Sequence, residues 1–332
     1  MPLNLHNLYS ELTIMIAMKD KIKELKDEIS KHIIGHSEMI DAMIIGLLSQ
    51  GHVLLEGVPG LAKTKSVNTL AKTIGLDFKR IQFTPDLLPS DILGVEIYNP
   101  KKEEFQLKKG ALFTNLLLCD EINRSSAKVQ SGLLEVMQER QVTIGEHSFK
   151  VDEPFFVLAT QNPIDEDGTY PLPQAQLDRF MLKIIVGYNS EVEEFEIAKK
   201  SANDNFEPIQ QVLDKESIQQ MQKEVKDIYI DDALTSYIVK LVFATRDPKG
   251  YNLPSLKESI SYGASPRATI DLLKAVKASA YIRGKKEVSV IDISLCAKNV
   301  LRHRIVLSYE AEAEDLSVDD VIETIMTSLE ID

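Results

Sequence analysis

The chain changes its pattern of hydrophobic positions a little past its midpoint. Between residues 31 and 188, short apolar runs alternate with stretches in which apolar residues recur every three or four positions. Several of the runs are apolar on both faces, which is typical of strands buried in a parallel sheet. We predict strands at His52–Glu56, Phe78–Phe83, Leu116–Cys119, Phe155–Thr160 and Met181–Val186. Strands that alternate with helices predict a three-layer α/β domain with a parallel sheet.

Helical periodicity marks the segments between these strands and dominates the rest of the chain. Lys63–Ile74 carries an apolar stripe and stops at Gly75, and Ser125 is the expected N-cap of the next helix. After Gly187 the strand signals fade, so residues 189–332 are expected to form a smaller, all-helical domain. Its expected helices are Glu191–Ser201, Ser217–Val225, Ala233–Thr245, Ala268–Ile282 and Val290–Leu307. Residues 1–30 are expected to be a charged, helical lead-in.

Composition and charge then limit the classes of function. The 332 residues are 44% hydrophobic and carry a net charge of −13, which argues against nucleic-acid binding by general charge attraction. Cys119 and Cys296 lie far apart in apolar stretches, as expected for core residues in a reducing compartment. The apolar run 12–18 is shorter than the roughly 20 residues that span a bilayer. We therefore expect a cytoplasmic protein without membrane insertion.

A glycine-rich segment follows the first predicted strand and opens the next helix. It reads Gly57, Val58, Pro59, Gly60, Leu61, Ala62, Lys63, Thr64, and Lys65 continues into the helix. This is the context of a P-loop, in which backbone N–H groups and the helix N-terminus cradle phosphates. Lys63 would reach the β- and γ-phosphates of ATP, and the Thr64 hydroxyl would bind Mg²⁺. The bland alternative is a strand-to-helix turn with a surface lysine.

One departure from the usual P-loop pattern and one supporting motif bear on this interpretation. Ala62 stands where the pattern usually has glycine, which is tolerable if the residue keeps ordinary helical dihedral angles. The strand 116–119 ends in Asp120 and Glu121. Asp120 would hold the Mg²⁺ shell, and Glu121 could polarise the attacking water. Acids that merely follow a strand are common, but both motifs in this order predict a magnesium-dependent ATPase.

Four motifs together resemble the MoxR branch of the AAA+ ATPases. They are Gly57–Thr64, Asp120–Arg124, Ala159–Pro163 and Gly168–Pro173, within a similarity that extends from about Ile33 to Arg304. Alanine before the P-loop lysine is usual in that branch. The resemblance implies an AAA+ domain over 31–188, with a helix-2 insert at about 92–110 and a pre-sensor hairpin at about 141–151. It also implies that the helical domain is a lid, with ATP held between the two.

The resemblance also implies roles for several polar side chains. Asn162 resembles the sensor-1 residue that orients the lytic water, although Asn before Pro is also a common turn. Arg179 resembles the arginine finger that enters the site of a neighbouring subunit, and Arg124 competes for that role. Arg267 resembles sensor 2 at the start of a lid helix. Surface ion pairs are the bland alternative for Arg179 and Arg267.

The implied activity is ATP hydrolysis coupled to the remodelling or maturation of a partner protein. Members of the branch assemble as rings, so we expect a hexamer, and they often act beside proteins with a von Willebrand A domain, which is the expected client. Ile34 and Gly35 would lie against adenine, or form an ordinary capping loop. A nucleic-acid motor or clamp-loading ATPase and a non-hydrolysing scaffold are the alternatives. The insert is only weakly basic, which counts against a nucleic-acid motor. A scaffold that does not hydrolyse ATP would not need Glu121, Asn162 and two arginines, which counts against the second alternative.

Overall fold

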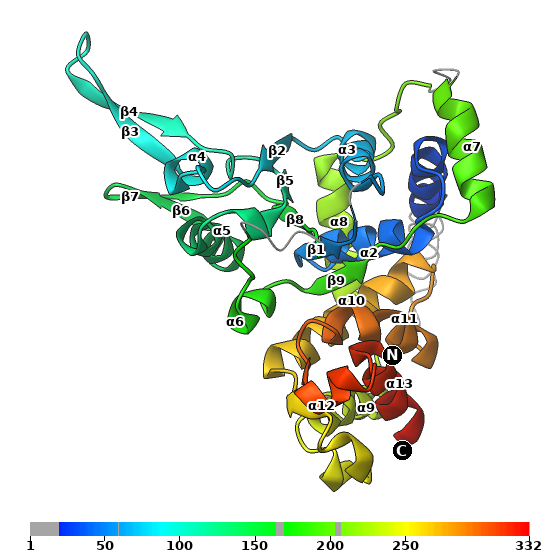
Figure 1. Cartoon of the computed structure of the whole chain (residues 1–332). Helices are drawn as coiled ribbons and strands as arrows, with labels where there is room; N and C mark the ends of the chain where they lie inside the picture. Colours follow the sequence, from blue (N-terminus) through cyan, green and yellow to red (C-terminus); the bar gives the residue numbers. More distant parts are fainter. Residues whose placement is uncertain (1–19, 59, 164–168, 203–206, 332) are drawn as a thin grey trace, which may run out of the picture.

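A five-stranded, all-parallel sheet organises the part of the chain that ends at about residue 187 (Figure 1). The computed structural model describes residues 20–58, 60–163, 169–202 and 207–331. The strand order is β2-β5-β8-β1-β9. The strands are β1 (Val53–Glu56), β2 (Phe78–Gln82), β5 (Leu116–Asp120), β8 (Phe156–Gln161) and β9 (Leu182–Ile185). These bounds confirm the five predicted strands to within one or two residues.

The sheet is buried because alternate residues of each central strand enter different cores. In β5, Leu116 and Leu118 pack into one cluster of buried side chains, whereas Leu117 and Cys119 pack into the other. Helices α2 (Ser37–Leu48) and α3 (Lys63–Thr73) supply the first cluster, and α5 (Ala127–Glu139) supplies the second. This arrangement confirms the three-layer α/β domain. The N-cap of α5 is Ser126 rather than the expected Ser125, whose hydroxyl instead contacts the Ile122 carbonyl.

Two antiparallel hairpins extend from the sheet domain. The first follows α4 (Pro89–Leu93) and pairs β3 (Gly94–Asn99) with β4 (Glu104–Lys109) over their full length. The second pairs β6 (Gln141–Ile144) with β7 (His147–Lys150). Figure 1 shows the β3–β4 hairpin projecting well beyond the body of the protein. The β3–β4 and β6–β7 hairpins occupy the segments expected to be the helix-2 insert and the pre-sensor hairpin, respectively.

Among the described residues after Gly187, the chain is helical apart from the small β10–β11 ladder and an isolated bridge between Tyr229 and Glu287. The helices of this part are α7 (Glu191–Ala202), α8 (Lys215–Asp227), α9 (Asp232–Ala244), α10 (Pro266–Ile282), α11 (Val290–Leu301), α12 (Tyr309–Ala313) and α13 (Val318–Ser328). The expectation of a continuous helix over Val290–Leu307 was wrong at its end. The chain leaves α11 at Leu301, and β11 (Val306–Leu307) then pairs with β10 (Ile260–Tyr262). Local hydrophobic periodicity cannot predict backbone pairing with a segment that is distant in the sequence.

The helical domain packs directly on the sheet domain. Buried residues of α2 and α3 and of helices α8 to α11 form one continuous cluster. The amide of Gln222 in α8 donates a hydrogen bond of 2.8 Å to the Leu47 carbonyl of α2. Residues 20–32 are helical, and Ile22, Leu25 and Ile29 insert into the same cluster. The described part of the lead-in is therefore integral to the core. No helix within the described residues is long and apolar enough to cross a membrane.

Candidate functional site

The glycine-rich loop leaves the carboxyl end of β1 and runs into α3. The Gly57 N–H donates to the Gln161 carbonyl at 3.3 Å, which ties the start of the loop to the end of β8. A Cβ atom at Gly57 would come 2.6 Å from the Val186 carbonyl oxygen, so only glycine fits there. Gly60 adopts φ of 87°, a backbone region that favours glycine. Pro59 lies outside the described residues, and the neighbouring Val58 packs against the core.

Ala62 does not have the helical dihedral angles that we expected. It is the N-cap of α3 and adopts φ of 53° and ψ of 16°, in the left-handed region. This conformation is unfavourable for a residue with a Cβ atom by about 1–2 kcal/mol. The condition under which we expected alanine to be tolerated is therefore not met. The loop instead holds Ala62 in a strained conformation, as binding loops commonly do.

A cavity of about 380 Å³ opens over this loop. Residues 60–65 line one side, and Asp120, Glu121 and Asn162 line the other. The Lys63 ammonium donates to the Gly57 carbonyl within the loop. Partial burial lowers the pKa of Lys63, and the nearby Asp120, Glu121 and Glu56 carboxylates oppose this shift. The structure thus brings the P-loop residues, both acids and Asn162 to one site.

The two acids at the end of β5 differ in their surroundings. Asp120 keeps only 8% of its side chain exposed, and its Oδ2 lies 3.4 Å from the Thr64 hydroxyl. Thr160 of β8 donates to Oδ1 of the same carboxylate at 3.3 Å. Glu121 adopts φ of 56°, and its N–H donates to the Thr160 hydroxyl at 2.9 Å. This left-handed residue ends the strand alternation, so both side chains face the same cavity.

Sequence reasoning missed two residues of this cavity that come from β2. Arg80 Nε lies 2.6 Å from Asp120 Oδ2, and the Gln82 amide donates to Glu121 Oε2 at 2.9 Å. Arg124 also contacts Glu121 Oε2, at 3.2 Å. The available signal was the spacing of Arg80 and Gln82, two polar residues on one face of a strand. It became informative only with the pairing register, which sets Gln82 beside Asp120.

Ile34 and Gly35 lie to one side of this cavity and do not line it. A Cβ atom at Gly35 would come 2.9 Å from side-chain atoms of Asn189 and Glu193. Val186 approaches Gly57 in the same way, so residues 186–193 connect the P-loop to the Gly35 segment. Gly35 and Gly57 therefore both approach the segment 186–193.

Arg179 and Arg267 lie together in a different part of the protein. Both line a cavity of about 730 Å³ between the sheet domain and the lid. Arg179 Nε donates to the Gln138 side chain at 3.2 Å, and Arg267 lies 3.4 Å from Asp178 Oδ2. Among the described residues, none from the lid lines the P-loop cavity. The structure does not bring either arginine to the nucleotide-binding loop of its own chain.

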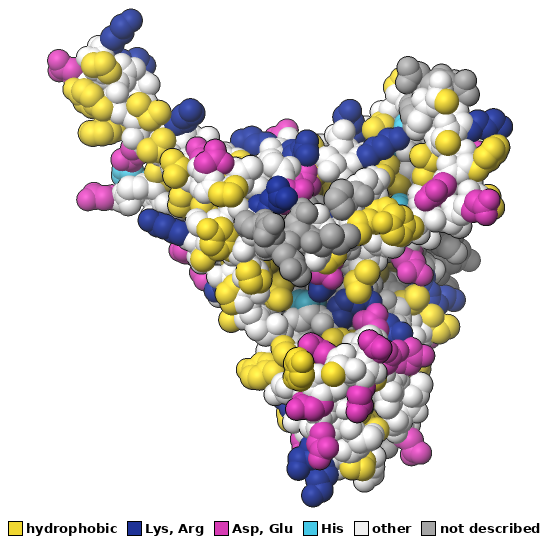
Figure 2. All heavy atoms as spheres, in the orientation of Figure 1, with side chains coloured by type: hydrophobic (Ala, Val, Ile, Leu, Met, Phe, Trp, Pro, Cys, Tyr) yellow, Lys and Arg dark blue, Asp and Glu magenta, His cyan; other side chains and the backbone are white. Residues whose placement is uncertain are grey.

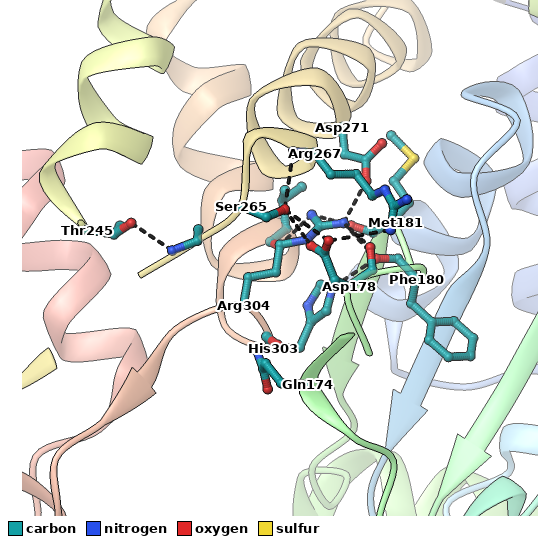
Figure 3. Close-up of polar contacts among 12 residues, drawn as sticks. Gln174, Asp178, Phe180, Met181, Thr245, Ser265, Arg267, Asp271, His303 and Arg304 are labelled. Carbon is teal, nitrogen blue, oxygen red and sulfur yellow. Dashed lines mark hydrogen bonds and ion pairs between the residues drawn. The ribbon is translucent and has the colours of Figure 1, made fainter. Parts of the chain in front are cut away.

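A buried guanidinium fixes the segment that carries Arg179. Arg304 is 1% exposed and contacts Asp178 Oδ1 at 2.8 Å and Asp271 Oδ2 at 2.6 Å (Figure 3). It also donates to the Phe180 carbonyl at 2.9 Å. Burial raises the pKa of Asp271, and Arg304 opposes that shift. This network joins the lid helix α10 to the residues on both sides of Arg179.

Comparisons with known proteins agree with this geometry. A model of the ATPase family associated with various cellular activities (AAA) matches residues 52–182, and an AAA lid domain model matches residues 255–325. The chain is 46% identical over 304 residues to Chaperone MoxR1 of Mycobacterium tuberculosis, covering 91% of this chain and 80% of that one. It is 42% identical over 306 residues to the uncharacterised protein YeaC of Bacillus subtilis, covering 92% and 93%.

A solved structure gives the same result at the level of the whole fold. A protein from Cytophaga hutchinsonii, described as a candidate ATPase, has a TM-score of 0.92 and 50% identity to this chain. The match covers 98% of this chain and 99% of that one. The sheet, the P-loop cavity and the lid define an ATPase of the AAA+ class. Within that class, the chain belongs to the MoxR family.

Proposed function

We propose that this ATPase hydrolyses Mg²⁺-bound ATP as a hexameric ring and uses the energy to remodel or mature partner proteins. The observation that carries the proposal is the convergence of Lys63, Thr64, Asp120 and Glu121 on one cavity. The four side chains come from two elements far apart in sequence, α3 and the end of β5. This set of groups matches the requirements of phosphoryl transfer to water, in which positioning and charge neutralisation supply most of the rate.

Each residue has a role that its surroundings support. Backbone N–H groups of residues 60–64 and the Lys63 ammonium bind the phosphates. Thr64 and Asp120 suit Mg²⁺, because a hydroxyl and a carboxylate oxygen only 3.4 Å apart face the cavity. The ion, when bound, neutralises charge on the phosphate oxygens. Glu121 accepts a hydrogen bond from the attacking water and polarises it, and Asn162 orients that water.

The position of the two remaining arginines supports the proposed ring. Arg179 and Arg267 lie in the interdomain cavity and away from the P-loop of their own chain. We propose that both act on the nucleotide of a neighbouring subunit. Arg124 contacts Glu121 within its own site, which favours Arg179 over Arg124 for this inter-subunit role. An arginine supplied in this way can contribute about 10³–10⁵ to the rate.

The proposed client is a protein, for which a von Willebrand A-domain protein is our first choice. One relative is named a chaperone. The β3–β4 hairpin exposes Ile97, Tyr98 and Phe105, and Figure 2 shows hydrophobic side chains gathered on it. The hairpin also mixes lysines with glutamates, so its charge does not favour a nucleic acid. A pull-down with Glu121→Gln in the presence of ATP tests which protein is bound.

The chemistry is tested with two variants that separate binding from turnover. Lys63→Ala should abolish ATP binding, because the phosphates lose their cation. Glu121→Gln should keep binding and lose turnover by about 10²–10⁴-fold, since it removes only the base. Calorimetry measures the first and phosphate release the second. Near-normal hydrolysis by Glu121→Gln would refute the assignment.

The shared site is tested by mixing two inactive variants, Arg179→Ala and Glu121→Gln. In a mixed ring, some interfaces join an intact Glu121 to an intact Arg179 of the neighbour, so partial activity should return. Each variant alone is the control, and co-purification through two different tags verifies that the subunits mix. A mixture that co-assembles and stays inactive would exclude the inter-subunit role of Arg179.

A further inference from the structure

Arg80 contacts the carboxylate that we assign to the Mg²⁺ site. Its Nε lies 2.6 Å from Asp120 Oδ2, the same oxygen that lies 3.4 Å from the Thr64 hydroxyl. Arg80 reaches the cavity from β2, the strand that neighbours β5 in the sheet. The ion pair therefore joins the floor of the nucleotide site to a strand outside the P-loop and the Asp-Glu motif.

The burial of Asp120 explains why a cation is needed there. Only 8% of the Asp120 side chain is exposed, and a buried carboxylate without a counter-charge is costly. Thr160 and Thr64 supply hydroxyl groups but no charge. The Lys63 ammonium contacts the Gly57 carbonyl instead. Arg80 supplies a positive charge in direct contact with Asp120.

Arg80 itself is held loosely. Its side chain is 52% exposed, in contrast to the buried Arg304 of the interdomain network. A half-exposed ion pair contributes little free energy. A divalent ion can therefore displace the guanidinium from Asp120 at a small cost.

We propose that Arg80 is a positioning residue that stands in for Mg²⁺ while the site lacks the metal. It neutralises Asp120 and keeps that carboxylate aimed at Thr64, and Mg²⁺ must compete with it when the nucleotide binds. Arg80 therefore lowers the metal's contribution to nucleotide affinity and favours release of the metal after hydrolysis. This inference rests on the proposed Mg²⁺ site.

The test measures ADP binding by calorimetry, once in EDTA and once with Mg²⁺, so that no turnover intervenes. For Arg80→Gln, the ADP dissociation constant in EDTA should stay within about twofold of the unmutated protein. With Mg²⁺ it should become about threefold to fivefold smaller, because the competitor for Asp120 is gone. Arg80→Lys keeps a cation and should restore values close to those of the unmutated protein.

Two control variants make the same change of charge elsewhere. Lys79→Gln alters the neighbouring residue of β2, whose ammonium contacts the Gly110 carbonyl outside the cavity. Arg124→Gln removes a cation that contacts the cavity residue Glu121. Neither should tighten binding with Mg²⁺ as strongly as Arg80→Gln. Equal tightening by Arg124→Gln would mean that only the overall charge matters, and would overturn the proposal.

The remaining outcomes are also decisive. Weaker ADP binding by Arg80→Gln in EDTA would show that Arg80 binds phosphate, and an unchanged affinity with Mg²⁺ would show no competition; either result overturns the inference. Circular dichroism melting verifies that each variant is folded. If the unmutated protein binds ADP equally well in EDTA and in Mg²⁺, the proposed Mg²⁺ site fails instead. The two failures are therefore distinguishable.

Discussion

A buried histidine immediately before β1 should make the stability of this protein depend on pH. His52 accepts a hydrogen bond at Nδ1 from the Val157 N–H, at 3.0 Å. Its Nε2 must then carry the proton and donate to the Met137 carbonyl, 3.2 Å away. The neutral ring is fully satisfied, and protonation at Nδ1 would place a donor against a donor. Burial, reinforced by Arg140, lowers the pKa of His52 from 6.5 to about 3.

The sign and size of the effect follow from this pKa. Below pH 6.5 the unfolded chain binds a proton at His52, whereas the folded protein does not until about pH 3. Proton binding therefore lowers the free energy of the unfolded state relative to the folded state as the pH falls, by about 1.36 kcal/mol per pH unit. Between pH 7 and pH 5 the folded protein should lose about 2 kcal/mol of stability through this residue. The loss is absent above the unfolded pKa.

The perturbation is His52→Asn, which keeps a short polar side chain but cannot titrate. Urea unfolding followed by far-ultraviolet circular dichroism, without nucleotide, gives the free energy of unfolding at both pH values. The drop from pH 7 to pH 5 should be about 2 kcal/mol smaller in the variant than in the unmutated protein. Burial also holds the pKa of His303 well below its usual value, but that residue is present in both proteins and cancels. Equal drops would refute the reasoning.

Other predictions concern the loop, the lead-in helix, the interdomain network and the ligand. Ala62→Gly should raise the free energy of unfolding by about 1 kcal/mol in urea titrations, because glycine relieves the left-handed strain; a loss of stability would contradict this. The Gln210 N–H and Lys31 hold the pKa of Glu28 at about 2. Glu28→Gln should thus be destabilising above pH 4.5, and the deficit in melting temperature should shrink as the pH falls towards 2. Arg304→Met removes the cation shared by Asp178 and Asp271 and should cost about 3–5 kcal/mol in urea unfolding, against under about 1 kcal/mol for the partly exposed Lys298→Ala; similar costs would argue against the network. ATP with Mg²⁺ should raise the melting temperature, by the equivalent of about 2.7 kcal/mol at a hundredfold excess over Kd, and EDTA should weaken the shift. The absence of a shift with any nucleoside triphosphate would argue against a working P-loop.

The sequence by itself determined the class of fold and the chemical groups at the ends of its strands. The three central strands β1, β5 and β8 were short apolar runs, because a strand covered on both faces has no polar face to interrupt it. The P-loop and Asp120-Glu121 could be assigned to one site because the carboxyl ends of parallel strands lie at the same edge. These are local patterns combined with a general rule of topology.

Only the tertiary structure decided which distant side chains meet. The Arg80 contact with Asp120 depends on β2 being the strand beside β5. The hydrophobic periodicity of the strands does not predict their order in the sheet. The strain at Ala62 depends on how the loop closes onto α3. Arg267 resembled a sensor-2 residue at the start of a lid helix, and the packing of α10 decides that it lies with Arg179 and not in the P-loop cavity of its own chain. Such positions depend on how whole helices and strands pack together. The packing of many side chains determines that arrangement, and no single residue does.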